Sequence, residues 1–323
     1  KSKRINTLTI STVCLLLTLF QNSCQTNAPS KRITIASSGK VNSLDPARAN
    51  TLKALQLISS LGDTLYELDN DGELIPKLAS KMPVISKDKL KISISLKKNI
   101  LFHDGTPFDS KAMKFTIERF QRIGTNNYIL DKKIKSIETP NKNTLIINLN
   151  KPASSLEGLL TSVNLTAISP SFYKNHIDKF LNNNFVGTGQ YVLKSFSNEV
   201  QILDPNLNYW DLKPKNHGIN FVGYSNSSSL YGALKSKQID LLLSNSIDDS
   251  QRKDLNFLSK KKEFKEGISN PTEVSFITLR TNIEPLNKKE IRLAISKTIN
   301  REEISKNVSY GLRRPSKSIV PQI

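Results

Sequence analysis

The sequence predicts an α/β protein, because strand and helix patterns alternate along it. Residues 90–97 alternate apolar and polar side chains, which is the period of a strand with one buried face. A helical pattern with a clear start signal follows at residues 109–124. Residues 219–243 then read as strand, helix, strand, an order typical of α/β folds. A length of 323 residues corresponds to about two domains and allows a buried core.

The stretch 102–108 joins that strand to that helix and is the centre of the interpretation. Asp104-Gly105 predicts a tight turn in which glycine takes a positive φ, and Pro107 fixes the direction in which the chain leaves it. We expect Asp109 to cap the helix and Gly124 to end it. The apolar stripe of this helix, spaced i, i+4 and i+7, is expected to face the core and consists of Met113, Ile117 and Phe120.

The remaining elements are predicted from apolar periodicity, capping residues and turn residues. In chain order we expect a strand at 32–36, a turn at Leu44-Asp45-Pro46, a helix capped near Asn50 and ended by Gly62, hairpins at 133–150 and 191–203, a short helix opening at Ser169-Pro170, a linker-rich boundary at 244–267, a strand at Val274–Leu279 and a helix capped near Asn287. No internal repeat is detected.

The chain is strongly basic. It has 47 Lys and Arg against 28 Asp and Glu, a formal net charge of +19. Such a charge favours polyanions such as nucleic acid or anionic lipid. The lysines are spread along the chain, however, with only short runs such as Lys260-Lys261-Lys262, and no arginine-rich or aromatic-interleaved motif accompanies them. We therefore favour a solvated basic surface over nucleic-acid binding.

The first 24 residues predict an export signal of the bacterial lipoprotein type. A positive start at residues 1–4 precedes an apolar run at 13–20 that is too short to span a bilayer. The signal ends at Ser23-Cys24, a small residue and the cysteine that would be lipidated, although Gln21 stands where such signals usually carry an aliphatic residue. The only other cysteine is Cys14, so the mature chain has no disulfide and no thiol chemistry.

Residues that resemble catalytic or cofactor motifs have simpler structural interpretations. His103-Asp104 are neighbours in a turn without a nucleophile motif, so we favour a structural turn over an acid-base pair. Gly187-Thr188-Gly189 lacks the lysine and the following helix of a phosphate loop, and we favour a crossing between domains that needs small residues. Tyr209-Trp210 is more typical of a core anchor than of a ligand-stacking platform.

The histidines have no carboxylate at metal-ligand spacing. We predict no catalytic residue, no metal site and no cofactor. The histidines are His103, His176 and His217.

Four blocks of residues occur in a fixed order between Ile33 and Pro321. They are Leu65-Tyr66-Glu67 with Pro76-Lys77-Leu78-Ala79; Phe102 to Phe108 with Glu118-Arg119; Gly187-Thr188-Gly189-Gln190-Tyr191 with Asn206 to Trp210; and Ile291 to Ile295 with Ile299-Asn300-Arg301-Glu302. Their order and spacing resemble the large extracellular solute-binding proteins that deliver peptides, and in some members nickel, haem or sugars, to ABC importers. Met82 and Gln190 stand where that family commonly has tryptophan and proline, which we interpret as local packing changes.

The resemblance implies an α/β, two-lobed periplasmic binding protein-like fold of type II with an extra inserted domain, incomplete at the C-terminus. After the signal at 1–24, it implies a discontinuous domain I at 31–63 and 187–266, an inserted domain II at 64–186 and the start of a truncated domain III at 267–323. The lobes would close about a hinge over ligand in the cleft between them. In peptide-binding relatives the acidic partner of the ligand's amino terminus comes from the absent part of domain III.

The function that the resemblance implies is that of a substrate-binding component of an ABC importer, with a peptide as the favoured solute over nickel, haem or sugar. Carried onto this sequence, Asn50, Thr51 and Leu52 would line the cleft and Phe276 would stack over the ligand, with a buried packing role left open for each. Implied partners are ABC permease subunits in the membrane. We expect a lipid-anchored monomer, exported to the periplasm or cell surface and held there through Cys24, that binds no nucleic acid. The alternatives are a basic surface lipoprotein that binds a polyanion or a protein and, less favoured, a hydrolytic enzyme.

Overall fold

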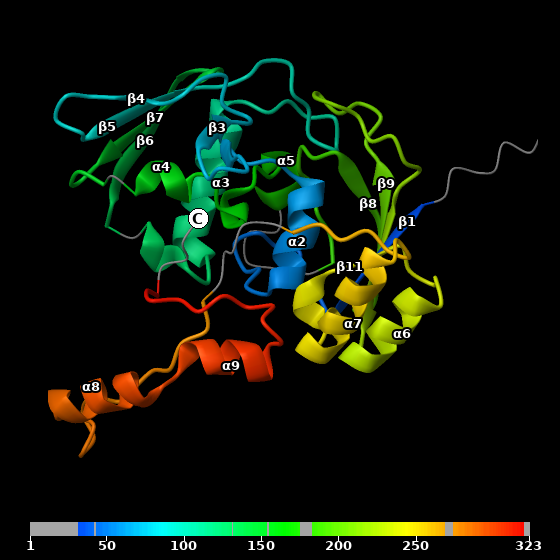
Figure 1. Cartoon of the computed structure of the whole chain (residues 1–323). Coiled ribbons are helices and arrows are strands. Elements are labelled where there is room, and N and C mark those ends of the chain that lie inside the picture. The colour runs from blue at the N-terminus through cyan, green and yellow to red at the C-terminus, as the bar shows by residue number, and fades with distance from the viewer. Residues whose placement is uncertain are drawn as a thin grey trace, which may run out of the picture.

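The computed structural model describes residues 32–319, apart from residues 42, 131, 154, 175–182 and 269–273. The predicted export signal with Cys24, and also His176, therefore lie outside the described residues. In the described part, the strands form two main sheets and a two-stranded ribbon, with helices packed on the sheets (Figure 1). None of the helices in this part is long and apolar enough to cross a membrane.

The first sheet has five strands in the order β11-β1-β10-β9-β8. Strand β1 pairs in parallel with both β10 and β11, whereas β9 runs antiparallel to β10 and to β8. Helix α6 (Ser227–Lys235) connects β10 to β11, which confirms the predicted strand-helix-strand unit. The strand bounds are β1 (Ile33–Ser38), β8 (Tyr191–Phe196), β9 (Val200–Pro205), β10 (Ile219–Tyr224) and β11 (Leu241–Leu242).

Neighbouring residues of β1 point into two different hydrophobic cores, because side chains alternate between the faces of a sheet. Ile35 packs against the core that helix α2 (Leu52–Leu61) covers, and Ala36 lies in the core under α6 and α7 (Asp249–Lys260). Helices therefore cover both faces of this sheet, which confirms the predicted α/β class (Figure 1). The residues that α2 buries in its core follow helical spacing and are Ala54, Leu57, Ile58 and Leu61.

The second sheet has the order β4-β5-β7-β6, is antiparallel throughout, and packs against helix α3 (Ser110–Ile123). Asp109 caps α3 by accepting a hydrogen bond from the Ala112 amide (3.0 Å), and Gly124 ends it, as predicted. The predicted apolar stripe of α3 is buried. The strand bounds are β4 (Val84–Ile85), β5 (Lys91–Ser95), β6 (Ile134–Asn141) and β7 (Thr144–Leu149), and the separate ribbon consists of β2 (Tyr66–Leu68) and β3 (Leu74–Pro76).

The segment Gly187-Thr188-Gly189 passes directly over the C-terminal end of α2. A Cβ atom on Gly189 would lie 2.3 Å from the backbone carbonyl carbon of Leu61, closer than any side chain can approach. This confirms the interpretation of a crossing that needs small residues. Short helices complete the connections and are η1 (Asn127–Ile129), α4 (Leu156–Leu159), η2 (Val163–Leu165), α5 (Pro170–Tyr173) and η4 (Ser244–Ser246).

Helices α8 (Lys289–Thr298) and α9 (Arg301–Val308) contain no buried residue. They project away from the two sheets in Figure 1. The segment after α9 returns to α7, where Arg313 Nε donates to Asp249 Oδ2 (3.0 Å). Four large apolar side chains of the two helices are exposed, namely Ile291, Leu293, Ile304 and Val308.

Two segments have a different secondary structure from the one predicted. Val274–Leu279 forms no strand, because an extended segment needs a neighbour for its backbone groups and the described residues pair none with it. The expected linker at 244–267 contains α7, which begins with a capping box formed by Asp248 and Gln251. The sequence of α7 is mostly polar, but the helix is amphipathic. Its apolar residue Leu255 packs against the core under α6.

Two predicted helix caps are also wrong. Thr51, rather than Asn50, caps α2, because its hydroxyl accepts from the Ala54 amide (3.3 Å). Helix α8 begins at Lys289 after Lys288, without a side-chain cap, instead of being capped near Asn287. Asparagine and threonine are both good caps, so composition alone does not choose between adjacent positions.

Candidate functional site

A buried ion pair joins the loop after β1 to helix α3. Arg119 Nη1 donates to Asp45 Oδ1 (2.7 Å) and Arg119 Nη2 to Asp45 Oδ2 (2.5 Å), so the guanidinium binds both carboxylate oxygens. Both side chains are buried, and the guanidinium carbon lies 5.0 Å from the centre of the Tyr173 ring. Each charge is compensated inside the protein, and loss of either partner would leave the other charge buried alone.

Asp45 also folds the loop that leads into α2. Its Oδ1 accepts from the Ala47 amide (3.1 Å), and its backbone carbonyl accepts from the amides of Arg48 (2.9 Å) and Ala49 (2.8 Å). A carboxylate that binds nearby backbone amides in this way stabilises a turn. The loop is therefore held from within by the residue that also anchors it to α3.

Two segments that are distant in the sequence lie against this loop. The Thr125 amide, just after α3, donates to the Ala47 carbonyl (2.9 Å). Asn164 Nδ2, in η2, donates to the carbonyls of Pro46 (2.6 Å) and Ala49 (2.8 Å). We call the surface formed by these three segments the α2 N-terminal face, which comprises residues 45–52, 124–129 and 162–165.

Three of the four predicted ligand residues are consecutive on the α2 N-terminal face. Asn50 is exposed, Thr51 is half-buried and its hydroxyl caps α2, and Leu52 is 44% exposed. Phe276 lies elsewhere in the chain, on the irregular segment 274–280, and is 68% exposed. The roles of all four residues in ligand binding stay predictions.

Two further residues of this face were not singled out from the sequence. Tyr128, on η1, is 70% exposed, and Asn164 holds the loop as described above. The sequence signal for Tyr128 is an aromatic residue that follows the polar run Gly124–Asn127 directly after a helix. Asn164 carries no such signal, because its importance arises from contacts with residues more than a hundred positions earlier.

A second polar cluster lies at the opposite end of α2. Asp63 Oδ1 accepts from Tyr209 OH (2.9 Å), and Asp63 Oδ2 accepts from Thr188 Oγ1 (2.9 Å) and Trp210 Nε1 (3.1 Å). Burial raises the pKa of Asp63, and the hydrogen bonds from Trp210, Thr188 and Tyr209 oppose that rise. The pair Tyr209-Trp210 thus anchors the buried Asp63, in agreement with the predicted core role.

His103 and Asp104 bind different partners. His103 Nε2 lies 3.1 Å from the Gly189 carbonyl oxygen, and burial lowers the pKa of its imidazole, which favours the neutral ring. The Asp104 carboxylate accepts from the hydroxyls of Ser169 (2.5 Å) and Thr106 (2.6 Å). With Gly105 at φ +79°, the stretch is the structural turn that the sequence predicted. Within the described residues, no three His, Cys, Asp or Glu side chains form a group that could hold a metal ion.

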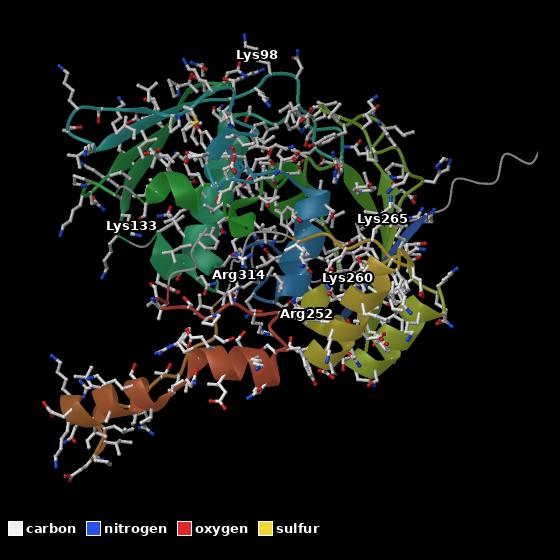
Figure 2. The ribbon with its side chains drawn as sticks, viewed as in Figure 1. Lys98, Lys133, Arg252, Lys260, Lys265 and Arg314 are labelled. Carbon is white, nitrogen blue, oxygen red and sulfur yellow. The ribbon has the colours of Figure 1, made fainter. Side chains whose placement is uncertain are left out.

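The basic side chains labelled in Figure 2 lie on separate parts of the molecule. Lys98 and Lys133 belong to the region of the second sheet, whereas Arg252 and Lys260 lie on α7. The charge of these side chains is therefore distributed over several elements instead of following one groove, which supports the interpretation of a solvated basic surface.

Residues 73–323 match the family of bacterial extracellular solute-binding proteins, family 5 Middle. The chain belongs to this family, because the match covers most of its length. This confirms the resemblance that the four blocks of residues indicated.

Individual relatives show the same relationship. The chain is 27% identical over 244 residues to the probable D,D-dipeptide-binding periplasmic protein DdpA of Escherichia coli (strain K12), which covers 73% of this chain and 46% of that protein. It is 24% identical over 296 residues to the glutathione-binding protein GsiB of Salmonella paratyphi A, which covers 90% of this chain and 56% of that protein. The chain thus spans about half the length of these curated relatives.

A solved structure shares the fold over most of the chain. NikZ from Campylobacter jejuni, in complex with Ni(L-His), has a TM-score of 0.73 and 25% sequence identity, and the match covers 89% of this chain and 58% of that one. NikZ therefore shares the arrangement of sheets described above over the matched part of the chain.

Proposed function

We propose that this chain is the solute-binding component of a bacterial ABC importer and that its solute is a peptide. The observation that carries the proposal is family membership over residues 73–323. The names of DdpA and GsiB, which refer to a D,D-dipeptide and to glutathione, support a peptide. A binding role rather than catalysis is supported by His103 and Asp104, whose side chains serve structural partners.

We place the ligand on the α2 N-terminal face. The first turn of α2 has backbone amides without partners inside the helix, and these suit the carbonyl or carboxylate oxygens of an extended peptide. Asn50 adds an exposed amide that both donates and accepts hydrogen bonds. Leu52, at 44% exposure, supplies an apolar contact for a ligand side chain.

The proposed mechanism is closure of one lobe on another. Domain I (31–63 and 187–266) would carry the five-stranded sheet, domain II (64–186) the four-stranded sheet, and the residues from 267 on would begin domain III. Movement of domain III over the α2 N-terminal face would bring the exposed ring of Phe276 onto the ligand. A ligand that contacts both lobes binds the closed form more tightly and shifts the population toward it.

We further propose that the protein is exported, lipidated at Cys24, monomeric and partnered with ABC permease subunits. The basic start, apolar run and Ser23-Cys24 of the sequence support the anchor. Replacement of Cys24 by serine in cells should move the protein from the membrane fraction to the soluble fraction. Retention of the variant in the membrane fraction would refute the anchor without bearing on the ligand.

A second candidate ligand is a nickel complex, which the structural likeness to NikZ with Ni(L-His) favours. A thermal-shift and calorimetric comparison of di- to tetrapeptides with Ni²⁺ plus L-histidine separates the two candidates. We expect peptides to raise the melting temperature of the purified chain. A shift with the nickel complex and with no peptide would overturn the peptide assignment.

The α2 N-terminal face is tested with a pair of variants. Leu52→Asp places a charge in the proposed apolar contact and should abolish the peptide response. Leu212→Asp, at a residue that is 81% exposed and follows β9, serves as the control and should preserve it. Equal peptide binding by both variants would show that the ligand lies elsewhere.

A further inference from the structure

The turn between β4 and β5 lies at the same end of the four-stranded sheet as the end of β7 and the start of β6 (Figure 1). The antiparallel register brings these segments together. Lys91 at the start of β5 pairs with Asn148 near the end of β7, and the Asn150 amide donates to the Lys133 carbonyl before β6 (2.9 Å). We call this place the basic end of the sheet, which comprises residues 86–91, 132–136 and 148–151.

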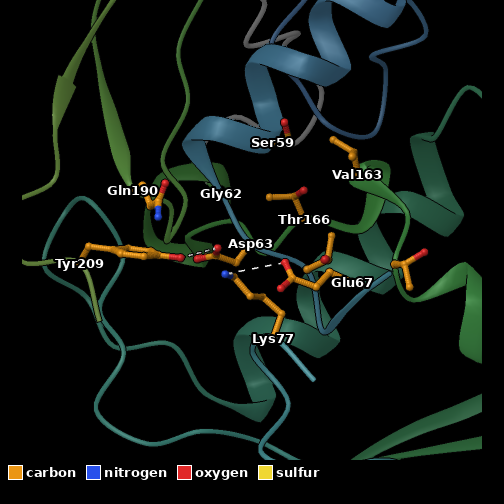
Figure 3. Close-up of a pocket in the computed structure, with 11 residues that line it drawn as sticks. Ser59, Gly62, Asp63, Glu67, Lys77, Val163, Thr166, Gln190 and Tyr209 are labelled. Carbon is orange, nitrogen blue, oxygen red and sulfur yellow. Dashed lines mark hydrogen bonds and ion pairs between the residues drawn. The ribbon is translucent and has the colours of Figure 1, made fainter. Parts of the chain in front are cut away.

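The basic end gathers lysines from three separate stretches of the sequence. Six of its lysines are exposed, and Lys133, which is labelled in Figure 2, is half-buried. Within the described part of the chain, none of them forms an ion pair with a carboxylate. Lys77, by contrast, lies 3.7 Å from Glu67 Oε2 in the pocket shown in Figure 3. The lysines of the basic end are Lys87, Lys89, Lys91, Lys132, Lys133, Lys135 and Lys151.

Few acidic residues oppose these lysines. Asp88 Oδ1 accepts from Ser86 Oγ (2.5 Å) and from the Leu90 amide (3.0 Å), and Glu138 Oε1 accepts from Asn148 Nδ2 (2.6 Å). The sequence adds Asp131, which lies outside the described residues. Seven lysines against these three acidic residues leave a formal charge of +4. The basic end is therefore a local concentration of positive charge on a surface whose other cations are scattered.

Exposed apolar side chains adjoin the lysines. Two of them belong to the edge strand β4, where Val84 is 58% and Ile85 is 42% exposed. Val84 pairs with Ser93 on β5, and Lys91 lies two residues before Ser93 on the same face of the sheet. The residues of β5 between these positions are buried in the core, so Val84 and Lys91 share the face that points away from α3. The surface thus combines cations with apolar contact area.

This combination fits an anionic bilayer better than a nucleic acid. Proteins that read nucleic acids rely on arginine forks and on aromatic rings that stack on bases, and the three segments contain neither arginine nor an aromatic residue. Lysine is a point charge that lipid phosphates attract in any geometry, and clusters of four to eight basic residues are typical of contacts with anionic lipids. Exposed valine and isoleucine side chains add an apolar contact with the bilayer interface.

We propose that the basic end of the four-stranded sheet is a membrane contact and that its partner is a bilayer surface containing anionic phospholipid. The lysines lie at the level of the lipid phosphates, and Val84 enters the interface between headgroups and acyl chains. The contact shares no residue with the α2 N-terminal face and does not depend on lipidation of Cys24. It sets the orientation of the protein on the membrane, with domain II toward the bilayer.

Cosedimentation with lipid vesicles tests the contact, using the full chain with Cys24→Ser so that no lipid is attached at that position. One set of vesicles consists of phosphatidylcholine, and the other of equal parts of phosphatidylcholine and phosphatidylglycerol. We expect at least about tenfold tighter binding to the anionic vesicles, lost as salt rises from about 0.05 to 0.5 M. The apolar run at 13–20 is common to all variants, so differences between them report the basic end alone.

Two triple variants that remove the same charge locate the contact. The first replaces one lysine of each segment by glutamine, namely Lys87, Lys135 and Lys151. The second does the same at exposed lysines at and after the end of α7, namely Lys260, Lys261 and Lys265. Each lysine near a bilayer contributes about fivefold to binding, so the first variant should bind anionic vesicles at least about tenfold more weakly, and the second should stay within about threefold of the parent chain.

A substitution on β4 tests the apolar part of the contact. Val84→Ser should weaken vesicle binding about threefold or more, because it removes apolar surface from the interface. Leu212→Ser, at a residue that is 81% exposed, is the matched control and should leave vesicle binding unchanged.

The outcomes separate this contact from its alternatives. Equal binding to both kinds of vesicle, or equal losses in the two triple variants, overturns the proposal, because the charge then acts only through its total. Binding to a DNA duplex but not to anionic vesicles overturns it in favour of a nucleic acid. Both triple variants should melt as the parent chain does, and if the first does not fold, Lys135→Gln alone, with a loss of about fivefold, decides. Peptide binding should be the same in all these variants, so failure of the membrane contact leaves the proposed function untouched.

Discussion

Arg119 and Asp45 form a bidentate ion pair that links the core of the five-stranded sheet to the core of the four-stranded sheet. Leu44, beside Asp45, lies in the core of the five-stranded sheet, and Phe120, beside Arg119, lies in the core of the four-stranded sheet. The pair therefore fixes the loop before α2 relative to α3. This contact holds the α2 N-terminal face in shape, although both charged side chains are buried below its surface.

Breaking this pair should destabilise the protein strongly. Arg119→Met leaves the Asp45 carboxylate buried without its partner, which costs about 3–5 kcal/mol of unfolding free energy. Urea unfolding measures the change, and Glu118→Gln on the exposed side of the same helix should stay within about 0.5 kcal/mol of the wild type. A loss in Arg119→Met as small as that of the control would mean that the pair does not hold the loop.

Gly189 and Gly232 should respond in opposite directions to substitution by alanine. Gly189→Ala would place a Cβ 2.3 Å from the backbone of Leu61, whereas a Cβ on Gly232, within α6, meets nothing within 4 Å. We expect Gly189→Ala to lower stability by about 3 kcal/mol or more, because backbone must move. Gly232→Ala should raise it by up to about 1 kcal/mol through helix propensity. Thermal unfolding of both variants checks the pair, and equal effects would contradict the close approach.

His103→Ala should reduce stability much more than ligand affinity, since the imidazole bonds to the Gly189 carbonyl and lies away from the α2 N-terminal face. We expect a loss of about 2 kcal/mol from the missing hydrogen bond and the space left behind. Peptide binding, measured by calorimetry below the melting transition, should change less than about threefold. The exposed His217→Ala is the matched control for stability.

The same histidine predicts a pH dependence. Burial lowers the pKa of His103 below its usual 6.5, so the unfolded chain binds a proton more readily than the folded one. The stabilising contribution is therefore complete above about pH 6.5 and is lost as the pH falls toward the folded-state pKa. Unfolding free energies of wild type and His103→Ala, compared between pH 8 and pH 5, should show a smaller acid loss in the variant, and parallel curves would refute this linkage.

Lys53 predicts a second pH dependence on the alkaline side. Its side chain is buried in α2 and its Nζ donates to the Gly39 carbonyl (2.9 Å). Burial lowers the pKa of Lys53 from 10.5 to about 8, against a smaller opposing effect of Glu199. The unfolded chain binds more protons between these values, so this lysine makes stability rise with pH from about 8 to 10.5. Lys53→Met should remove that rise and the exposed Lys111→Met should keep it, which urea unfolding across this range measures.

Local chemistry explains which elements were predictable. Helix α3 is defined by contacts within a few residues: Asp109 caps it, the stripe from Met113 to Phe120 faces the core, and Gly124 ends it. All three features occur in the structure as expected. Helix α7 was missed because its sequence is mostly polar and its one capping box resembles a loop. The strand expected at Val274–Leu279 was wrong because apolar alternation describes a strand only when another strand lies beside it.

The candidate site was predictable only in part, for a related reason. Asn50, Thr51 and Leu52 follow a recognisable turn, so they could be named, whereas the partners that shape their surroundings could not. Asn164 and Thr125 reach the same loop from far along the chain. No spacing in the sequence encodes these approaches.

The sequence by itself determined the α/β class, the strand-turn-helix corner at 102–124 and membership in a solute-binding family, because periodicity, caps and motif order act over short distances. Only the tertiary structure decided that Arg119 meets Asp45, that Gly189 must be glycine, and that Thr188, Tyr209 and Trp210 bind the buried Asp63. Those facts depend on burial and on contacts between distant residues, where the free energy of a charge or a hydroxyl is set by what surrounds it.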